Sequence, residues 1–341
     1  MVLATTVGTG SAAQAAPALP SWQERPTGTT EQFRGLAAVN RYVGWVAGSG
    51  GTVLRTFDGG RHWEDVSPLG AEELEFRDIE AFGARHAVAL TIGEGDASRV
   101  YVTRDGGRHW QESFVNDDPA AFYDCMTFFD ERHGLAMSDP VDGRIRLIRT
   151  SDGGRSWRVA DPAGMPDALP GEFGFAASGT CLVSSGPRDA WIATGGGERS
   201  RVFHTRDRGR TWSVTDTPVP SGPSAGIYAL AFRGRRHGLA VGGDYTTPES
   251  APDAFATTRD GGRSFELVGA GAPTEYRSGA AWLGARVAFA VGPTGSDVSV
   301  DGGRTWRTFD EGSLDGVQCT ADRACWGSGP DGRVTILRDY P

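Results

Sequence analysis

An eight-residue motif that recurs six times constrains the fold of this chain more than any other feature. The copies share a Ser or Thr, an Asp two residues later, a Gly two residues after that and a final Trp or Phe. Their aspartates are Asp58, Asp105, Asp152, Asp207, Asp260 and Asp301, and a seventh, incomplete copy, Leu337-Arg338-Asp339, ends the chain. The period of about 47 residues matches one four-stranded blade of a β-propeller.

Each repeat shows the same alternation of apolar strands and polar turns. In the first repeat we predict strands at 33–39, 43–48, 52–56 and 62–66, with the motif as the turn between the third and fourth. Its Asp can accept backbone N–H bonds across that turn, its glycines permit positive φ, and its aromatic residue packs beside the sheet. We therefore interpret the six aspartates as structural.

The two ends of the chain are predicted to complete one blade together. The seventh repeat stops after its third strand, while the segment Trp22-Gln23-Glu24-Arg25 resembles the start of a fourth strand. Pairing them would close a ring and leave no exposed sheet edge. The predicted fold class is all-β, a seven-bladed propeller of four-stranded antiparallel blades, forming a single domain over residues 16–341.

The first residues suggest targeting outside the cytoplasm. Residues 1–15 carry no charge and end in Ala13-Gln14-Ala15, which fits an export signal cleaved after Ala15, although a disordered Ala-rich leader is the alternative. An exported, extracytoplasmic or secreted protein would keep its disulfides. Cys319 and Cys325 flank a short turn and are predicted to pair. Cys125 and Cys181 occupy matching first-strand positions and could pair or stay free.

Composition excludes several kinds of ligand. The net charge of -9 argues against nucleic acid, no apolar stretch is long enough for a transmembrane helix, and all 34 basic residues are Arg, which removes lysine chemistry. Five of the six His occupy repeated turn positions without metal-ligand spacing, and no Gly-x-Gly-x-x-Gly opens a helix. We expect no metal, no cofactor and a monomer.

The residues that begin the first strands should line one mouth of the central channel. Counting back from the strand ends Val39, Phe82, Phe128, Phe232 and Trp282 places five residues at equivalent positions, namely Arg34, Arg77, Tyr123, Ile227 and Arg277. Clustered arginines suit an anionic partner. The alternative is that they are neutralised by nearby acids, namely Glu31, Glu73, Glu75, Asp78 and Asp315. Loops between second and third strands vary in length and belong to the same face, where recognition is expected.

The repeated motif resembles the Asp-box, or bacterial neuraminidase repeat, over residues 22–341. With one seven-bladed ring and the second strand Gly44-Trp45-Val46-Ala47-Gly48, the chain looks most like the photosystem II stability/assembly factor family. That resemblance implies a propeller that binds protein through an arginine patch, to which Arg34, Arg77 and Arg277 could correspond. A sialidase is disfavoured because Phe33-Arg34-Gly35-Leu36 lacks the Ile-Pro of the sialidase motif.

These observations predict a non-catalytic binding or assembly propeller that recognises a protein or an extracellular polymer through its loop face. The alternative is a glycoside hydrolase or lyase that uses acids of that face, such as Asp124, Asp139 and Asp244.

Overall fold

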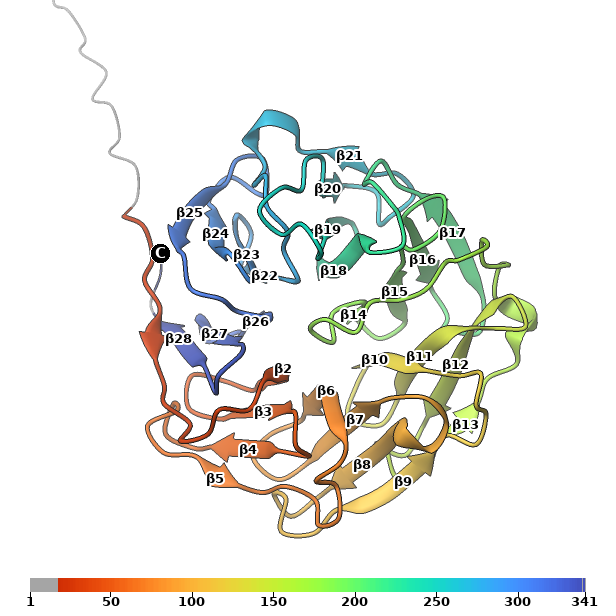
Figure 1. The fold of residues 1–341 in the computed structure, drawn as a ribbon, viewed down its shortest axis with the longest axis vertical. Helices are drawn as coiled ribbons and strands as arrows, with labels where there is room; N and C mark the ends of the chain where they lie inside the picture. The colour runs from red at the N-terminus through yellow and green to blue at the C-terminus, as the bar shows by residue number, and fades with distance from the viewer. Residues whose placement is uncertain (1–17, 339, 341) are drawn as a thin grey trace, which may run out of the picture.

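The computed structural model describes residues 18–338 and residue 340; the proposed export signal and Asp339 lie outside the described residues. Within this part of the chain, seven antiparallel sheets of four strands surround a central channel (Figure 1). The seven-bladed propeller predicted from the repeat is therefore confirmed. No helix in the described part is long and apolar enough to cross a membrane.

Each blade takes four strands in order from the centre outwards. Blade 1 holds β2 (Phe33–Ala38), β3 (Gly44–Gly48), β4 (Val53–Thr56) and β5 (Glu64–Asp65); blade 2 holds β6 (Glu75–Ala81), β7 (Ala87–Ile92), β8 (Arg99–Thr103) and β9 (Gln111–Val115); blade 3 holds β10 (Tyr123–Phe128), β11 (Gly134–Val141), β12 (Arg144–Thr150) and β13 (Arg158–Val159); blade 4 holds β14 (Leu182–Ser185), β15 (Asp189–Ala193), β16 (Arg201–Thr205) and β17 (Trp212–Asp216).

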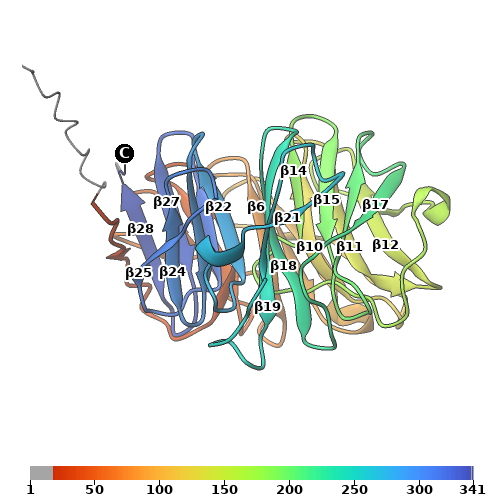
Figure 2. The same ribbon diagram turned by 90° about the horizontal axis from the view of Figure 1, so that it is seen from above.

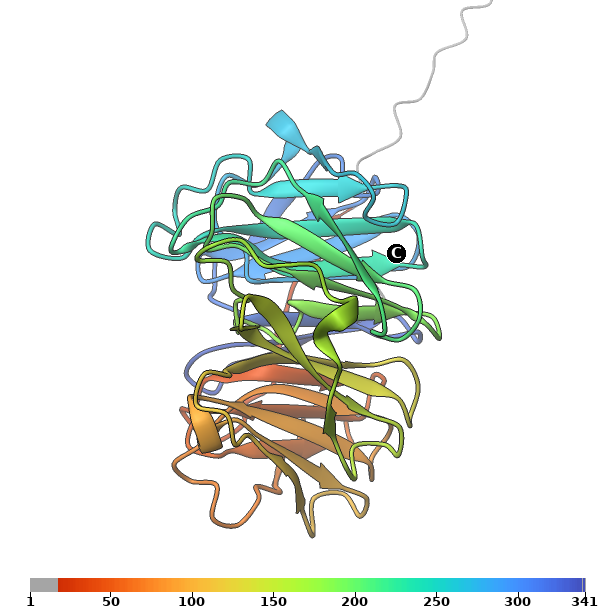
Figure 3. The ribbon, with the colours of Figure 1, turned by 90° about the vertical axis from the view of Figure 1, so that its right-hand side faces the viewer.

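The remaining blades follow the same order. Blade 5 holds β18 (Ala225–Arg233), β19 (His237–Asp244), β20 (Phe255–Thr258) and β21 (Glu266–Leu267); blade 6 holds β22 (Gly279–Leu283), β23 (Val287–Gly292), β24 (Gly295–Ser299) and β25 (Arg307–Asp310); blade 7 holds β26 (Gly316–Cys319), β27 (Ala324–Ser328), β28 (Val334–Arg338) and β1 (Gln23–Glu24). Three short 3-10 helices, η1 (Gly95–Ala97), η2 (Pro162–Gly164) and η3 (Gly269–Gly271), lie in connections, and Figure 3 shows η3 (cyan) at the rim of the disc.

Strand β1 closes the ring, as predicted. Gln23 pairs with Ile336 and Glu24 with Thr335, so the first strand forms the outer edge of the last blade. Figure 1 shows this red strand beside the blue β28. The closure is further held by the Arg25 N–H, which donates to the Val334 carbonyl at 2.7 Å.

The repeated turns share one hydrogen-bond pattern. In all six, the hydroxyl of the first residue donates to the Asp and accepts the N–H of the Gly four residues after it. At Asp260, burial opposes ionisation, but hydrogen bonds from Ser264, Thr258 and the turn N–H groups lower its pKa to about 2. These aspartates are therefore occupied within their own turns.

The aromatic residues of the motif join neighbouring blades. Trp63 packs edge-on against Trp326 with ring centroids 6.3 Å apart, and Trp110 packs against Trp45 at 6.4 Å. The Trp110 indole also donates to the Val66 carbonyl of the preceding blade at 2.6 Å. Because each such contact crosses from one blade to the next, the motif supports the ring as well as the turn.

The strands cross the thickness of the disc, so their turns lie on two opposite faces (Figure 2). We call the face that carries the six repeated turns the motif face. The opposite face, which carries the loops between second and third strands, is the loop face.

Candidate functional site

The loop face opens into a cavity of about 730 Å³ at the centre of the ring, which we call the mouth cavity. The charged side chains of its lining form what we call the charged wall, and these are Arg34, Arg77, Glu94, Asp124, Asp139 and Asp315. Aromatic side chains line another part, and these are Phe122, Phe173, Phe175, Tyr228, Tyr245 and Tyr276. The two arginines were predictable from the repeat, whereas no sequence pattern indicated the aromatic residues, which we call the aromatic wall.

A bulge near the start of the inner strand aims several of these side chains into the channel. In blades 1, 2, 3 and 5 the pairing register skips one residue, which is Arg34, Arg77, Asp124 or Tyr228. A bulged residue has no cross-strand partner, so its side chain is re-aimed away from the regular alternation. All four bulged residues line the mouth cavity.

This register corrects the predicted position of two of the binding residues, Tyr123 and Arg277, at the mouth of the channel. The equivalent strand ends, each paired with a residue six positions later, are Ala38, Ala81, Phe128, Phe232 and Trp282. The sequence comparison instead used Val39 and Phe82 in the first two blades, so its positions in blades 3, 5 and 6 were one residue early. The residues equivalent to Arg34 are Asp124, Tyr228 and Ser278, not Tyr123, Ile227 and Arg277.

Tyr123 and Arg277 accordingly lie away from the mouth cavity. Tyr123 is fully buried against Phe114, with ring centroids 5.5 Å apart. Arg277 is 1% exposed, and its Nε donates to Asp297 at 2.6 Å. A second guanidinium nitrogen donates to the hydroxyl of Thr294 at 2.7 Å. Arg277 is thus neutralised inside blade 6, by Asp297 and Glu275 and not by any of the acids named from the sequence.

Arg34 and Arg77 do come together, but with different degrees of pairing. Arg77 donates to the Ala176 carbonyl at 2.6 Å and to Glu75 at 2.9 Å. Arg34 is 3.9 Å from Asp315, its Nε is buried without a hydrogen bond, and its guanidinium donates no hydrogen bond to any described residue. Burial and the charge of Arg34 lower the pKa of Arg77. Arg34 is therefore the arginine of this wall with donors left for a ligand.

Two carboxyl groups of the charged wall, those of Asp124 and Asp139, lie next to each other. Burial and the neighbouring charge of Asp139 raise the pKa of Asp124 well above its usual range, and burial raises that of Asp139 to about 6. Each carboxyl group acts on the pKa of the other, so the two side chains lie close together. Glycosidase carboxyl groups stand about 5–9.5 Å apart to admit a sugar or water. Asp124 and Asp139 lie side by side and show no such gap, and the half-buried Asp244 accepts the Thr246 hydroxyl of its own loop at 2.6 Å.

The aromatic wall is a continuous set of ring contacts. Tyr228 stacks on Phe175 with centroids 3.9 Å apart and meets Tyr276 edge-on at 4.8 Å. Phe173 packs edge-on against Phe175 at 4.8 Å. Tyr245, which is 56% exposed, extends the set to the surface. Such rings offer a rigid apolar surface at low entropic cost.

The floor of the cavity is residues 174–180 of blade 4, which we call the channel segment. Figure 1 shows it entering the centre of the ring before β14. Ser178 donates to the Ser278 carbonyl of blade 6 at 2.7 Å, and the Thr180 carbonyl accepts from Leu230 of blade 5 at 3.0 Å. A second cavity of about 340 Å³, lined by Asp78 and Glu80 among others, lies beyond it.

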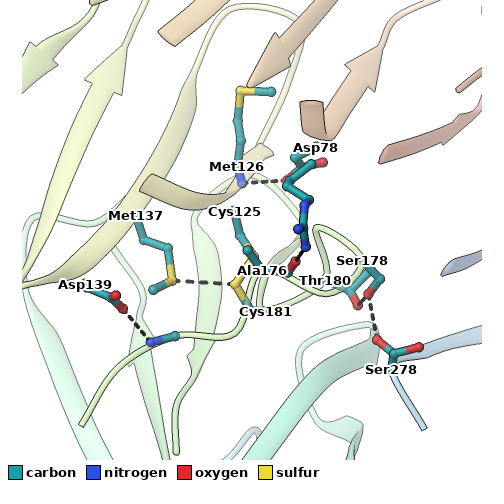
Figure 4. The surroundings of a disulfide bond; sticks show 12 residues. Asp78, Cys125, Met126, Met137, Asp139, Ala176, Ser178, Thr180, Cys181 and Ser278 are labelled. Carbon is teal, nitrogen blue, oxygen red and sulfur yellow. Dashed lines mark hydrogen bonds between the residues drawn. A yellow bond between two sulfur atoms is a disulfide. The ribbon is translucent and has the colours of Figure 1, made fainter. Parts of the chain in front are cut away.

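Two disulfides form in the structure. Cys319 joins Cys325 as predicted, and Cys125 joins Cys181, which settles the pairing left open by the sequence. Cys181 directly follows the channel segment, so the second bridge ties that segment to blade 3 (Figure 4). Asp139, which is labelled in the same view, accepts the N–H of Gly174 at 2.8 Å. Disulfides of this kind indicate an oxidising, non-cytoplasmic environment.

These features define a disulfide-bonded seven-bladed β-propeller with a cavity at the mouth of its channel. Comparison with solved structures finds YCF48, a photosystem II assembly factor, in a complex with a D1 peptide: the TM-score is 0.68 at 16% identity, covering 95% of this chain and 99% of that one. YCF48 from Cyanidioschyzon merolae matches with a TM-score of 0.67 at 15% identity, covering 93% and 98% of the two chains.

The same fold occurs in proteins of other kinds. A streptogramin B lyase matches with a TM-score of 0.63 at 9% identity, covering 93% of this chain and 97% of the lyase. No protein-family model and no curated protein matches the sequence. At these identities the likeness shows the fold, and the resemblance to the assembly factor is supported at that level.

Proposed function

We propose that this chain is an exported binding propeller that recognises a partner, a protein or an extracellular polymer, in the mouth cavity without a covalent step. The observation that carries the proposal is the unsatisfied guanidinium of Arg34 beside the aromatic wall. An anionic group of the partner would complete the hydrogen bonds of Arg34, and an apolar group would cover Tyr245.

Two further observations support a protein partner. YCF48 has the same fold and has been observed with a bound D1 peptide, so such a ring can hold a peptide. The two disulfides agree with a site of action outside the cytoplasm. The close contact of Asp124 and Asp139 offers no support for the hydrolase alternative.

The test is affinity capture with chemical cross-linking from the cell envelope and culture fluid, followed by mass spectrometry. Arg34→Ala and Tyr245→Ala remove one charged and one aromatic contact, while Arg61→Ala removes an exposed arginine of the motif face as the matched control. Partners held by wild type and the control but lost from both cavity variants, with unchanged thermal melts, would support the proposal. Equal capture by all four proteins would refute it.

A further inference from the structure

A second concave site lies on the motif face, away from the mouth cavity. It is a groove of about 640 Å³ between blades 5 and 6, which we call the arginine groove. Its basic lining residues are Arg233, His237, Arg259, Arg286 and Arg304, and its acidic ones are Glu266 and Asp301. Arginine therefore predominates here in a protein whose net charge is -9.

Three of these arginines have no partner within the protein. Arg259, Arg286 and Arg304 are exposed, and their guanidinium groups make no ion pair or hydrogen bond with any residue in the described part of the chain. Arg233 instead donates to the Ala285 carbonyl and lies over the Trp282 ring, 4.7 Å from its centroid. The groove thus presents several unused guanidinium donors to solvent.

The two acids of the groove, Glu266 and Asp301, are outnumbered by its four arginines and form no ion pair with them within the described chain. Asp301 accepts the N–H groups of Arg304 and Thr305, each at 3.0 Å, and the Thr305 hydroxyl at 2.7 Å. Its carboxylate is therefore directed into its own turn. Burial, and then the charges of Arg233, Arg236 and Arg259, lower the pKa of His237. Arg233 and Arg259 therefore both act on His237, and they would likewise both attract an anion bound in the groove.

We propose that the arginine groove binds a strand of an acidic polysaccharide through its carboxylate or sulfate groups. Guanidinium forks match such anions with paired hydrogen bonds, and several arginines along one groove suit a chain with repeated charges. The groove is concave, which fits a single strand better than a flat lipid surface. The oxidising environment indicated by the disulfides favours a polysaccharide over a nucleic acid.

The test measures binding of fluorescent oligogalacturonate and of a heparin-derived oligosaccharide by anisotropy, the two probes separating carboxylate from sulfate recognition. Arg259→Glu/Arg304→Glu reverses two charges in the groove. Arg61→Glu/Arg108→Glu reverses two exposed arginines at motif positions of blades 1 and 2, with the same change in net charge. The groove variant should bind about tenfold or more weakly, and the control should bind like wild type.

Several results would overturn this proposal. These are no binding of either acidic probe by wild type, equal loss in both double variants, or groove-dependent binding only to anionic lipid vesicles or single-stranded DNA. Thermal melts verify that the variants fold. The Arg34→Ala protein should bind the acidic probes normally, so failure at the mouth cavity and failure at the arginine groove remain distinguishable.

Discussion

The two disulfides close loops of very different length, and their removal should therefore have unequal effects on stability. The bridge between Cys125 and Cys181 spans 56 residues, whereas that between Cys319 and Cys325 spans 6. Loop-closure entropy predicts a loss of about 4 kcal/mol for Cys125→Ala/Cys181→Ala. The same relation predicts about 2 kcal/mol for Cys319→Ala/Cys325→Ala, which serves as the matched control.

Urea unfolding without reductant, followed by tryptophan fluorescence, measures both losses. The m-value should rise when the long loop is opened, because the unfolded chain then exposes more surface, so stability is compared as the free energy of unfolding in water. Hydrogen exchange adds a local readout, because only the longer bridge ties the channel segment to blade 3 and the amides of residues 174–180 should lose protection. An equal loss of stability in the two variants, or a larger one for the short loop, would refute this reasoning.

Three further predictions concern the carboxyl pair, the repeated turn and ring closure. Because folding raises the pKa of Asp124 and that of Asp139 to about 6, the native state binds more protons than the unfolded chain between pH of about 4 and about 6, and stability falls as the pH rises through this range. Asp124→Asn should therefore stabilise the protein at neutral pH and flatten the pH dependence measured by urea unfolding; a steeper dependence would contradict the assigned pair. Asp260→Ala removes the acceptor of two backbone N–H groups and should cost about 1–2 kcal/mol in the same assay, whereas Asp117→Ala, at an exposed residue with no hydrogen bond to the described chain, should have little effect. A chain beginning at Pro26 lacks β1, so light scattering should detect association through the exposed edge of β28; a stable monomer would show that closure does not protect this edge.

The repeat by itself determined the architecture. Each motif copy fixes a turn by local contacts, because a Thr or Ser hydroxyl, the Asp and the second Gly all lie within five residues. The number of copies then fixes the number of blades, and the missing strand at one end predicts its supply from the other. The Cys319–Cys325 bridge was predictable for the same reason, since both residues flank one short turn.

The residues that line the mouth cavity could not be predicted from the repeat alone. A bulge changes the register by one residue, and a one-residue error in aligning the strand ends exchanged Asp124 for Tyr123. In each bulged blade the bulged residue lies four positions before the equivalent strand end, which is Phe128 in blade 3 and Phe232 in blade 5. Aligning the strands on these ends would have found Asp124 and Tyr228. The channel segment has no counterpart in the other repeats, so no alignment indicates that it crosses the ring.

What only the tertiary structure decided is which side chains meet across blades. Arg34, Asp139, Tyr245 and Asp315 come from four different blades and share one cavity. Arg259 and Arg304 of the arginine groove likewise come from two neighbouring blades. The sequence fixes local turns through short-range hydrogen bonds, but the curvature of the ring brings distant residues together, and that curvature results from packing between blades.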